Sequence, residues 1–151
     1  MRPYRVYRIE NGTVIDHITN GQALKVLHIL DLGTDSEIAV GMNFESKKLG
    51  KKDIVKVENA FVADEVADKI ALIAPRATVN NIRDGELVSK HAIRVPDCLS
   101  GALRCINPNC ITNKECIVTR FVRVPDRPRL AYRCAYCERI MDEPDFADNL
   151  V

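Results

Sequence analysis

The sequence predicts an α+β protein with two domains: a ferredoxin-like antiparallel sheet with two helices, followed by a small all-β domain that is zinc-ribbon-like. Two observations predict this arrangement. In the first two thirds of the chain, pairs of strand-like runs alternate with two helical patterns, and all six cysteines lie in the last third. We expect the domains to cover residues 1–95 and 96–151, with a short linker over residues 93–101, where apolar periodicity is weak.

The first domain should begin with a β-hairpin over residues 4–18. Its strands flank Asn11-Gly12, a dipeptide that supplies the positive φ angles of a tight turn. A helix is predicted next, over residues 21–32, with Asn20 as its N-cap and Gly33 at its end. The apolar residues that recur at helical spacing in this segment are Ala23, Leu24, Leu27, Leu30 and, less regularly, Val26.

Two strands are predicted over residues 38–44 and 54–57, joined by a basic loop. The lysines of that loop are Lys47, Lys48, Lys51 and Lys52. A second helix is predicted over residues 63–74, because acidic residues occupy its first turn and Pro75 follows it.

A final hairpin should bring residues 78–82 and 86–91 together around Asp84-Gly85, which suits a two-residue turn. The resulting order, two strands, a helix, two strands, a helix and two strands, contains the βαββαβ arrangement of ferredoxin-like domains. An antiparallel sheet with both helices on one face follows from it.

Four cysteines in two close pairs predict one structural zinc ion. Cys105 and Cys110 flank four residues, Cys134 and Cys137 flank two, and both spacings fit zinc knuckles. Strands over residues 117–124 and 130–133 would bring the pairs together. Four thiolates leave no open position for water or substrate, so the ion should act on folding and not on chemistry.

Other interpretations of the cysteines are reduced core thiols, two disulfides, a redox pair at Cys134 and Cys137, or a ligand role for Cys98 or Cys116. Close pairing in a reducing compartment favours zinc, and a zinc-bound sulfur is a poor nucleophile for thiol exchange. Cys98 and Cys116 are expected to be small buried hydrophobic residues.

The charge balance argues against a general polyanion binder, because 22 Lys and Arg face 21 Asp and Glu. The first eight residues are charged where a signal peptide needs an apolar core, and no segment reaches the length of a membrane span. A cytoplasmic location is therefore expected.

Asp16 and His17 are ionisable residues in a run that otherwise suits a buried strand. Adjacent strand residues point to opposite faces, so the pair should not form a catalytic dyad. We expect one side chain to be exposed and the other to hydrogen-bond a neighbouring strand. Lys52, Lys56 and Lys90 lie on or beside predicted strands, where an ammonium group could bind phosphate or simply face solvent.

Four features together resemble one known family. They are the segments Gly12–Ile18, Lys51–Asn59 and Ala74–Asn80, and the four paired cysteines. Over nearly its whole length the sequence resembles the regulatory chain of aspartate carbamoyltransferase.

This resemblance implies a non-catalytic regulatory subunit with an N-terminal allosteric domain that binds nucleoside triphosphates, with CTP, ATP and UTP as effectors. It also implies a C-terminal zinc domain that contacts the catalytic chain. Regulatory homodimers would join catalytic trimers into a heterododecamer of six catalytic and six regulatory chains. The function would be feedback control of pyrimidine synthesis.

The resemblance also implies roles for individual residues. The effector-binding residues would be Asp16, His17, Lys56, Asn80, Ile82, Lys90 and, as a weaker candidate, Lys52. Of these, Lys56 and Lys90 would hold the ribose or phosphates, whereas Asn80 and Ile82 would line the base. The strand at residues 6–9 would line the same pocket. For the catalytic-chain contact, we hypothesise that Asn107, Asn109, Asn113 and nearby residues take part, because the cysteine loops should project beyond the metal core.

Two other functions fit the sequence less well. A nucleic-acid-binding zinc ribbon is suggested by Arg120, Arg123, Arg127, Arg129 and Arg133, but Asp142, Glu143, Asp145 and Asp148 balance that charge and the chain has no Trp for base stacking. An independent enzyme using Asp16 and His17 lacks a nucleophile motif, a phosphate loop and an open metal site.

Overall fold

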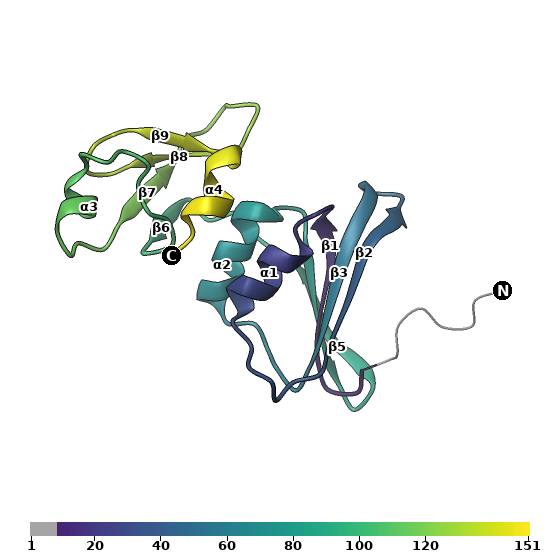
Figure 1. The fold of residues 1–151 in the computed structure, drawn as a ribbon. Coiled ribbons are helices and arrows are strands. Elements are labelled where there is room, and N and C mark those ends of the chain that lie inside the picture. The colour runs from purple at the N-terminus through teal and green to yellow at the C-terminus, as the bar shows by residue number, and fades with distance from the viewer. Residues whose placement is uncertain (1–8) are drawn as a thin grey trace. The chain divides into compact units, whose positions relative to one another are not determined.

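The computed structural model describes residues 9–151, which form two compact units that divide between Ile93 and Arg94 (Figure 1). Among the described residues, no helix is both long enough and apolar enough to span a membrane.

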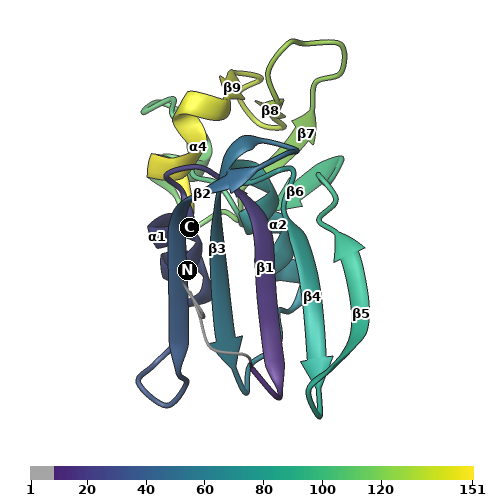
Figure 2. The same ribbon diagram turned by 90° about the vertical axis from the view of Figure 1, so that its right-hand side faces the viewer.

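The first unit is a five-stranded antiparallel sheet with two helices. Its elements are β1 (Gly12–Thr19), α1 (Ala23–Leu30), β2 (Ile38–Ser46), β3 (Gly50–Glu58), α2 (Asp64–Ile73), β4 (Thr78–Arg83) and β5 (Glu86–Ala92). The strand order is β2-β3-β1-β4-β5 (Figure 2). The first four strands with α1 and α2 make a ferredoxin-like βαββαβ unit, and β5 extends it by a hairpin. The predicted α+β fold is therefore confirmed.

Both helices lie on one face of this sheet (Figure 1). Strand alternation points Ile15, Val55 and Val79 toward the helices, and all three are buried, together with Val26 of α1 and Ile70 of α2. Each fully buried side chain of this size contributes about 1.5–3 kcal/mol through loss of water contact. Within residues 9–151, no helix lies on the opposite face of the sheet (Figure 1).

The start of the predicted first hairpin, residues 4–8, lies outside the described residues. Gly12 is the first residue of β1 and pairs with Glu58 on one side and Ile82 on the other. Its φ is +148°, and a Cβ at this position would lie 2.1 Å from the Val57 carbonyl oxygen. Glycine is thus required here by the close approach of β3.

Helix α1 is shorter than the predicted span of residues 21–32. Asn20 does not cap it, because the Asn20 side chain instead donates hydrogen bonds to Asn43 and Asp53. The helix ends at Leu30, and its C-cap Asp31 takes the left-handed conformation, so the end lies before the expected Gly33. Leu24 was expected on the buried stripe but is 63% exposed, whereas Val26 is fully buried.

The remaining predicted elements of the first unit are present. Strands β2 and β3 are longer than expected and include Lys51 and Lys52, so only residues 47–49 separate them. Helix α2 begins with Asp64 and Glu65 in its first turn. Asp84 (φ +52°) and Gly85 (φ +77°) form the two-residue turn between β4 and β5.

The second unit is a four-stranded antiparallel sheet of order β6-β7-β8-β9. Its elements are β6 (Cys98–Ser100), α3 (Ile111–Lys114), β7 (Arg120–Arg123), β8 (Ala131–Cys134), β9 (Ile140–Asp142) and α4 (Glu143–Asn149). Its core contains Phe121, Tyr132 and Phe146, and the last two rings meet edge to face at 5.8 Å. The small sheet domain expected after the linker is confirmed.

The predicted linker over residues 93–101 is wrong at its end. Leu99 pairs with Phe121, and its burial makes β6 an integral strand although three residues are too few to show periodicity. Helix α4 was also not anticipated. It begins with a capping box between Asp142 and Asp145.

Candidate metal centre and effector-binding face

The four paired cysteines converge in the second unit. Cys105 and Cys110 flank the loop before α3, Cys134 ends β8, and Cys137 lies in the turn before β9. Their sulfur atoms all lie within 4.8 Å of one another, with Cys105 Sγ 3.5 Å from Cys137 Sγ and Cys110 Sγ 3.8 Å from Cys134 Sγ. A tetrahedral zinc ion with bonds of about 2.3 Å needs sulfurs about 3.8 Å apart. The four-thiolate set therefore fits such an ion.

Hydrogen bonds from a side chain and from backbone amides hold both cysteine turns in place without metal. Asn113 Nδ2 donates to the carbonyl oxygens of Cys105 and Asn107, both at 2.8 Å, and the Cys110 amide donates to the Asn107 carbonyl. In the other turn, the Cys134 amide donates to Arg139. The side-chain amide of Asn113 therefore stabilises the cysteine loop, whereas Asn109 is exposed to solvent.

The thiols have unequal proton affinities. Burial raises the pKa of Cys105 to about 12. Burial also acts to raise the pKa of Cys137, but hydrogen bonds from the Arg139 backbone, Asn107 and neighbouring thiols lower it to about 7. A divalent cation would displace the protons from all four sulfurs and offset the cost of burying thiolates.

All six cysteines are free thiols, so the disulfide alternative does not hold in this structure. Cys98 and Cys116 are both exposed, and the expectation that they are buried is wrong. Cys98 begins strand β6 at the sheet edge, and Cys116 follows the short helix α3. Neither belongs to the four-cysteine group.

The sheet register brings the candidate effector residues onto one face of the first unit. Val14 of β1 lies opposite Lys56 of β3 and Asn80 of β4, and Asn80 lies opposite Lys90 of β5. Directly opposed residues share a face. These side chains therefore form a row across four strands on the face opposite α1 and α2, which we call the open face. Ile82 is two residues from Asn80, in the neighbouring row.

Asp16 and His17 do not follow simple alternation. A β-bulge interrupts the β1–β3 register between Ile15 and Ile18, and His17 has a φ of +56°. The His17 ring consequently turns back toward Asp16, with 4.0 Å between His17 Nδ1 and Asp16 Oδ2. The expectation that these side chains point to opposite faces is wrong, because alternation assumes a strand without a bulge.

Two further contacts fix this pair. Lys52 Nζ lies 2.9 Å from Asp16 Oδ1, and His17 Nδ1 lies 3.2 Å from Thr78 Oγ1. The His17 amide donates to Asp16 Oδ1 at 2.7 Å. Thr78 was not among the predicted site residues, although it lies in the segment Ala74–Asn80. Its hydroxyl orients the imidazole.

The electrostatics of this face suit an anion. Partial burial acts to raise the pKa of Asp16, but the hydrogen bonds from Lys52 and the His17 amide outweigh it and lower the pKa. The pKa of His17 is lowered by desolvation and then by the charges of Lys52, Lys48 and Lys90, against the opposing effect of Asp16. Three lysine charges thus act on the imidazole and favour its neutral form.

The side chain of Asn80 is a further indication of a ligand-binding site. Its side-chain oxygen is buried and has no hydrogen-bond partner in the described part of the chain. An unpaired buried acceptor costs free energy unless a ligand, water or another group donates to it.

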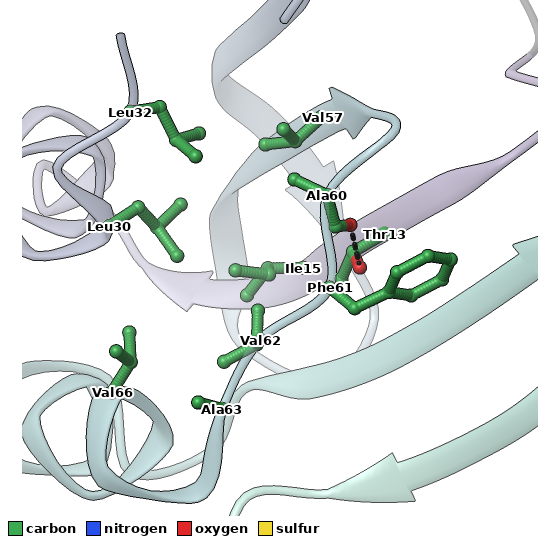
Figure 3. A pocket seen from close by; sticks show the side chains of 10 residues that line it. All are labelled: Thr13, Ile15, Leu30, Leu32, Val57, Ala60, Phe61, Val62, Ala63 and Val66. Carbon is green, nitrogen blue, oxygen red and sulfur yellow. Dashed lines mark hydrogen bonds between the residues drawn. The ribbon is translucent and has the colours of Figure 1, made fainter.

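A separate apolar cavity of about 110 Å³ lies on the helix-bearing face of the same sheet (Figure 3). Leu30, Val57 and Val66 point into it, and Thr13 at its edge donates to the Ala60 carbonyl. None of the candidate effector residues lines this cavity. It is a gap in packing on the other side of the sheet from the charged face.

The fold and the two sites define a class of protein in which a ferredoxin-like domain precedes a small four-cysteine metal-binding domain. Family models match both parts: the allosteric domain of the aspartate carbamoyltransferase regulatory chain over residues 4–94, and its metal binding domain over residues 97–147. The chain belongs to the aspartate carbamoyltransferase regulatory chain family.

Curated relatives agree with this assignment. The chain is 51% identical to an aspartate carbamoyltransferase regulatory chain of Pyrococcus abyssi, over 99% of this chain and 100% of the relative. It is 53% identical to that of Thermofilum pendens, over 97% and 94%, and 47% identical to that of Methanopyrus kandleri, over 92% and 90%.

Proposed function

We propose that this chain is a non-catalytic regulatory subunit that binds a nucleoside triphosphate on the open face of its first sheet and passes the effect to an aspartate carbamoyltransferase catalytic chain. The observation that carries the proposal is the convergence of Lys52, Lys56, Lys90 and His17 on that face from three strands. Three ammonium groups beside an imidazole suit a polyphosphate.

The separate residues would have separate tasks. Lys56 and Lys90 would hold the phosphates or ribose, and Lys52 would hold Asp16 in place through its 2.9 Å contact while adding to the positive field. The unpartnered Asn80 oxygen would accept a hydrogen bond from the nucleotide, with Ile82 beside it packing on the base. CTP, ATP and UTP share the triphosphate that this arrangement recognises.

In the second unit, Cys105, Cys110, Cys134 and Cys137 would bind one zinc ion with a structural role. The exposed parts of the cysteine loops, including Asn109, would contact the catalytic chain, and regulatory dimers would join catalytic trimers as a complex of six catalytic and six regulatory chains. Reduced thiols of this kind suit the cytoplasm, where pyrimidine synthesis would be controlled.

Nucleotide binding is tested by titration calorimetry of the zinc-loaded chain with CTP and ATP. Replacing Lys56 or Lys90 by Met should weaken binding about tenfold or more, because each change removes a charge-assisted contact worth roughly 1.5–3 kcal/mol. Lys69→Met removes the same charge from α2, on the other side of the sheet, and should leave the affinity within about twofold of wild type, as expected for a half-buried residue distant from the proposed contacts. Equal losses in all three variants would contradict the proposed site.

A further inference from the structure

Asp53 is a fully buried carboxylate in β3 that the proposed nucleotide site does not use. Its Oδ1 accepts hydrogen bonds from Asn20 Nδ2 and the Asn43 amide, both at 3.1 Å. Its Oδ2 accepts from the amides of Gly21 at 2.9 Å and Ala23 at 3.1 Å. One carboxylate therefore ties β3 to the chain after β1, to the start of α1 and to β2.

These bonds occur where both neighbours of β3 are irregular. The β1 bulge, which contains His17, ends at Ile18, the residue that pairs with Asp53. The β2 register shifts between Gly41 and Phe44, and Asn43 within this shift has a φ of +63°. A bulge leaves backbone groups without ladder partners. The Asp53 carboxylate accepts from the Asn43 amide inside the β2 shift and from the Gly21 and Ala23 amides, which follow the β1 bulge.

We infer that Asp53 is a positioning residue for the effector site: by anchoring Asn20, Gly21 and Asn43, it holds the β1 bulge in the conformation that turns His17 beside Asp16. The inference rests on the proposed function for its effect on nucleotide affinity, but its effect on His17 geometry is independent of any ligand. The adjacent residue, Lys52, reaches the open face and contacts Asp16. Lys52 and Asp53 therefore stabilise the bulge from opposite faces of the sheet.

The Asp53→Asn change tests this inference because it preserves shape but not acceptors. Each carboxylate oxygen accepts from two donors, whereas an amide offers one oxygen and one NH₂ group. In either orientation, two donors face the NH₂ group. Either the contacts to Asn20 and Asn43 or those to Gly21 and Ala23 must break.

The first measurement is nuclear magnetic resonance of the full zinc-loaded chain without nucleotide. Backbone couplings and carbon shifts report the positive φ of His17. Asp53→Asn should move them toward extended-strand values, while Asp35→Asn, which removes the same charge from an exposed residue between α1 and β2, should not. If His17 keeps its positive φ in Asp53→Asn, the positioning role is wrong.

The second measurement is a double-mutant cycle with His17→Ala, using CTP as the probe. If Asp53 acts through His17, Asp53→Asn should weaken CTP binding up to about tenfold in the wild-type background, equivalent to one charge-assisted hydrogen bond, and less than about twofold when His17 is already Ala. An undiminished loss in the His17→Ala background would overturn the inference.

A third variant guards against simple unfolding. Asn20→Ala removes one partly exposed donor and leaves the charge of Asp53 paired with three amides. It should shift the His17 signals in the same direction by a smaller amount, and unchanged signals would overturn the inference. If wild type fails to bind CTP, the proposed function fails, whereas the His17 signals still decide the role of Asp53.

Discussion

His17 shows how a single backbone angle decides what a site can contain. A regular strand would place Asp16 and His17 on opposite faces, and only the bulge with φ +56° at His17 brings both onto the open face. Residue type alone identified the pair as unusual, but the bulge depends on Asp53 and Asn43, which are distant in sequence. The local sequence therefore indicates that Asp16 and His17 are unusual, but it does not predict the bulge that places them on one face.

The position of His17 predicts a pH dependence of nucleotide binding. Desolvation and nearby lysines lower its pKa in the free chain, so it is mostly neutral near pH 7. A bound triphosphate would favour the protonated ring and raise that pKa, so affinity should increase as pH falls from about 7.5 until the pKa of the free residue is passed.

Calorimetry with CTP between pH 6 and 8, in buffers of different ionisation enthalpy, measures both the affinity and the protons taken up. His17→Gln should lose the contribution of the imidazole and keep only that of the terminal phosphate, which titrates in the same range. Equal pH slopes for wild type and His17→Gln would show that His17 does not respond to the ligand.

Among the elements, the cysteine turns could be predicted in full and α1 only in part. Cysteine spacing carries the ligand geometry directly, since Cys105 and Cys110, and Cys134 and Cys137, each lie within one turn. Helix α1 is capped by Asp53 from another strand, so no local cap marks its start. Strand β6 was missed because a three-residue strand depends on its pairing partner.

Removal of the metal should unfold the second unit and spare the first. The second unit has a small core, and a structural zinc ion of this type contributes about 10 kcal/mol or more to folding. The first unit contains no cysteine and has its own buried core. Amide exchange after treatment with a strong chelator should show lost protection in β7 and β8 and retained protection in β1 and β3.

Readdition of zinc should restore the exchange pattern, and Cys134→Ser should reproduce the metal-free pattern without chelator. Cys98→Ser provides the matched control, because this exposed thiol is not part of the four-cysteine group. Protection of β7 that survives chelation would mean that the sheet is stable without metal.

At the scale of the whole molecule, the order of strands and helices predicted the ferredoxin-like unit, and the cysteines confined to the last third predicted the small domain after it. Alternating strand pairs and helices leave few arrangements of an antiparallel sheet, and the observed order β2-β3-β1-β4-β5 is one of them. The residues that contact a partner cannot be predicted in this way, because exposed residues carry no periodic pattern. Membership of the regulatory-chain family implies the partner, while its contact residues remain a proposal.

Mixing the zinc-loaded chain with the aspartate carbamoyltransferase catalytic chain of the same source should give a larger complex, measurable by light scattering. CTP or ATP should then change its aspartate saturation curve, since an effector can act only by binding two assembly states with different affinity. Asn109→Ala should weaken assembly but leave nucleotide binding by the free chain unchanged. A nucleotide that binds without altering the curve would separate binding from regulation.

The four cysteines also set an order of events during synthesis. Cys105 and Cys110 precede the β7–β8 hairpin, Cys134 ends it and Cys137 follows it, so the ligand set is incomplete until residue 137 has left the ribosome. The first unit, by contrast, ends at Ile93 and contains no ligand to this ion. A cell short of zinc would therefore accumulate chains whose first domain is folded but whose second domain is not. Metal supply would then limit how many chains become competent to join a partner.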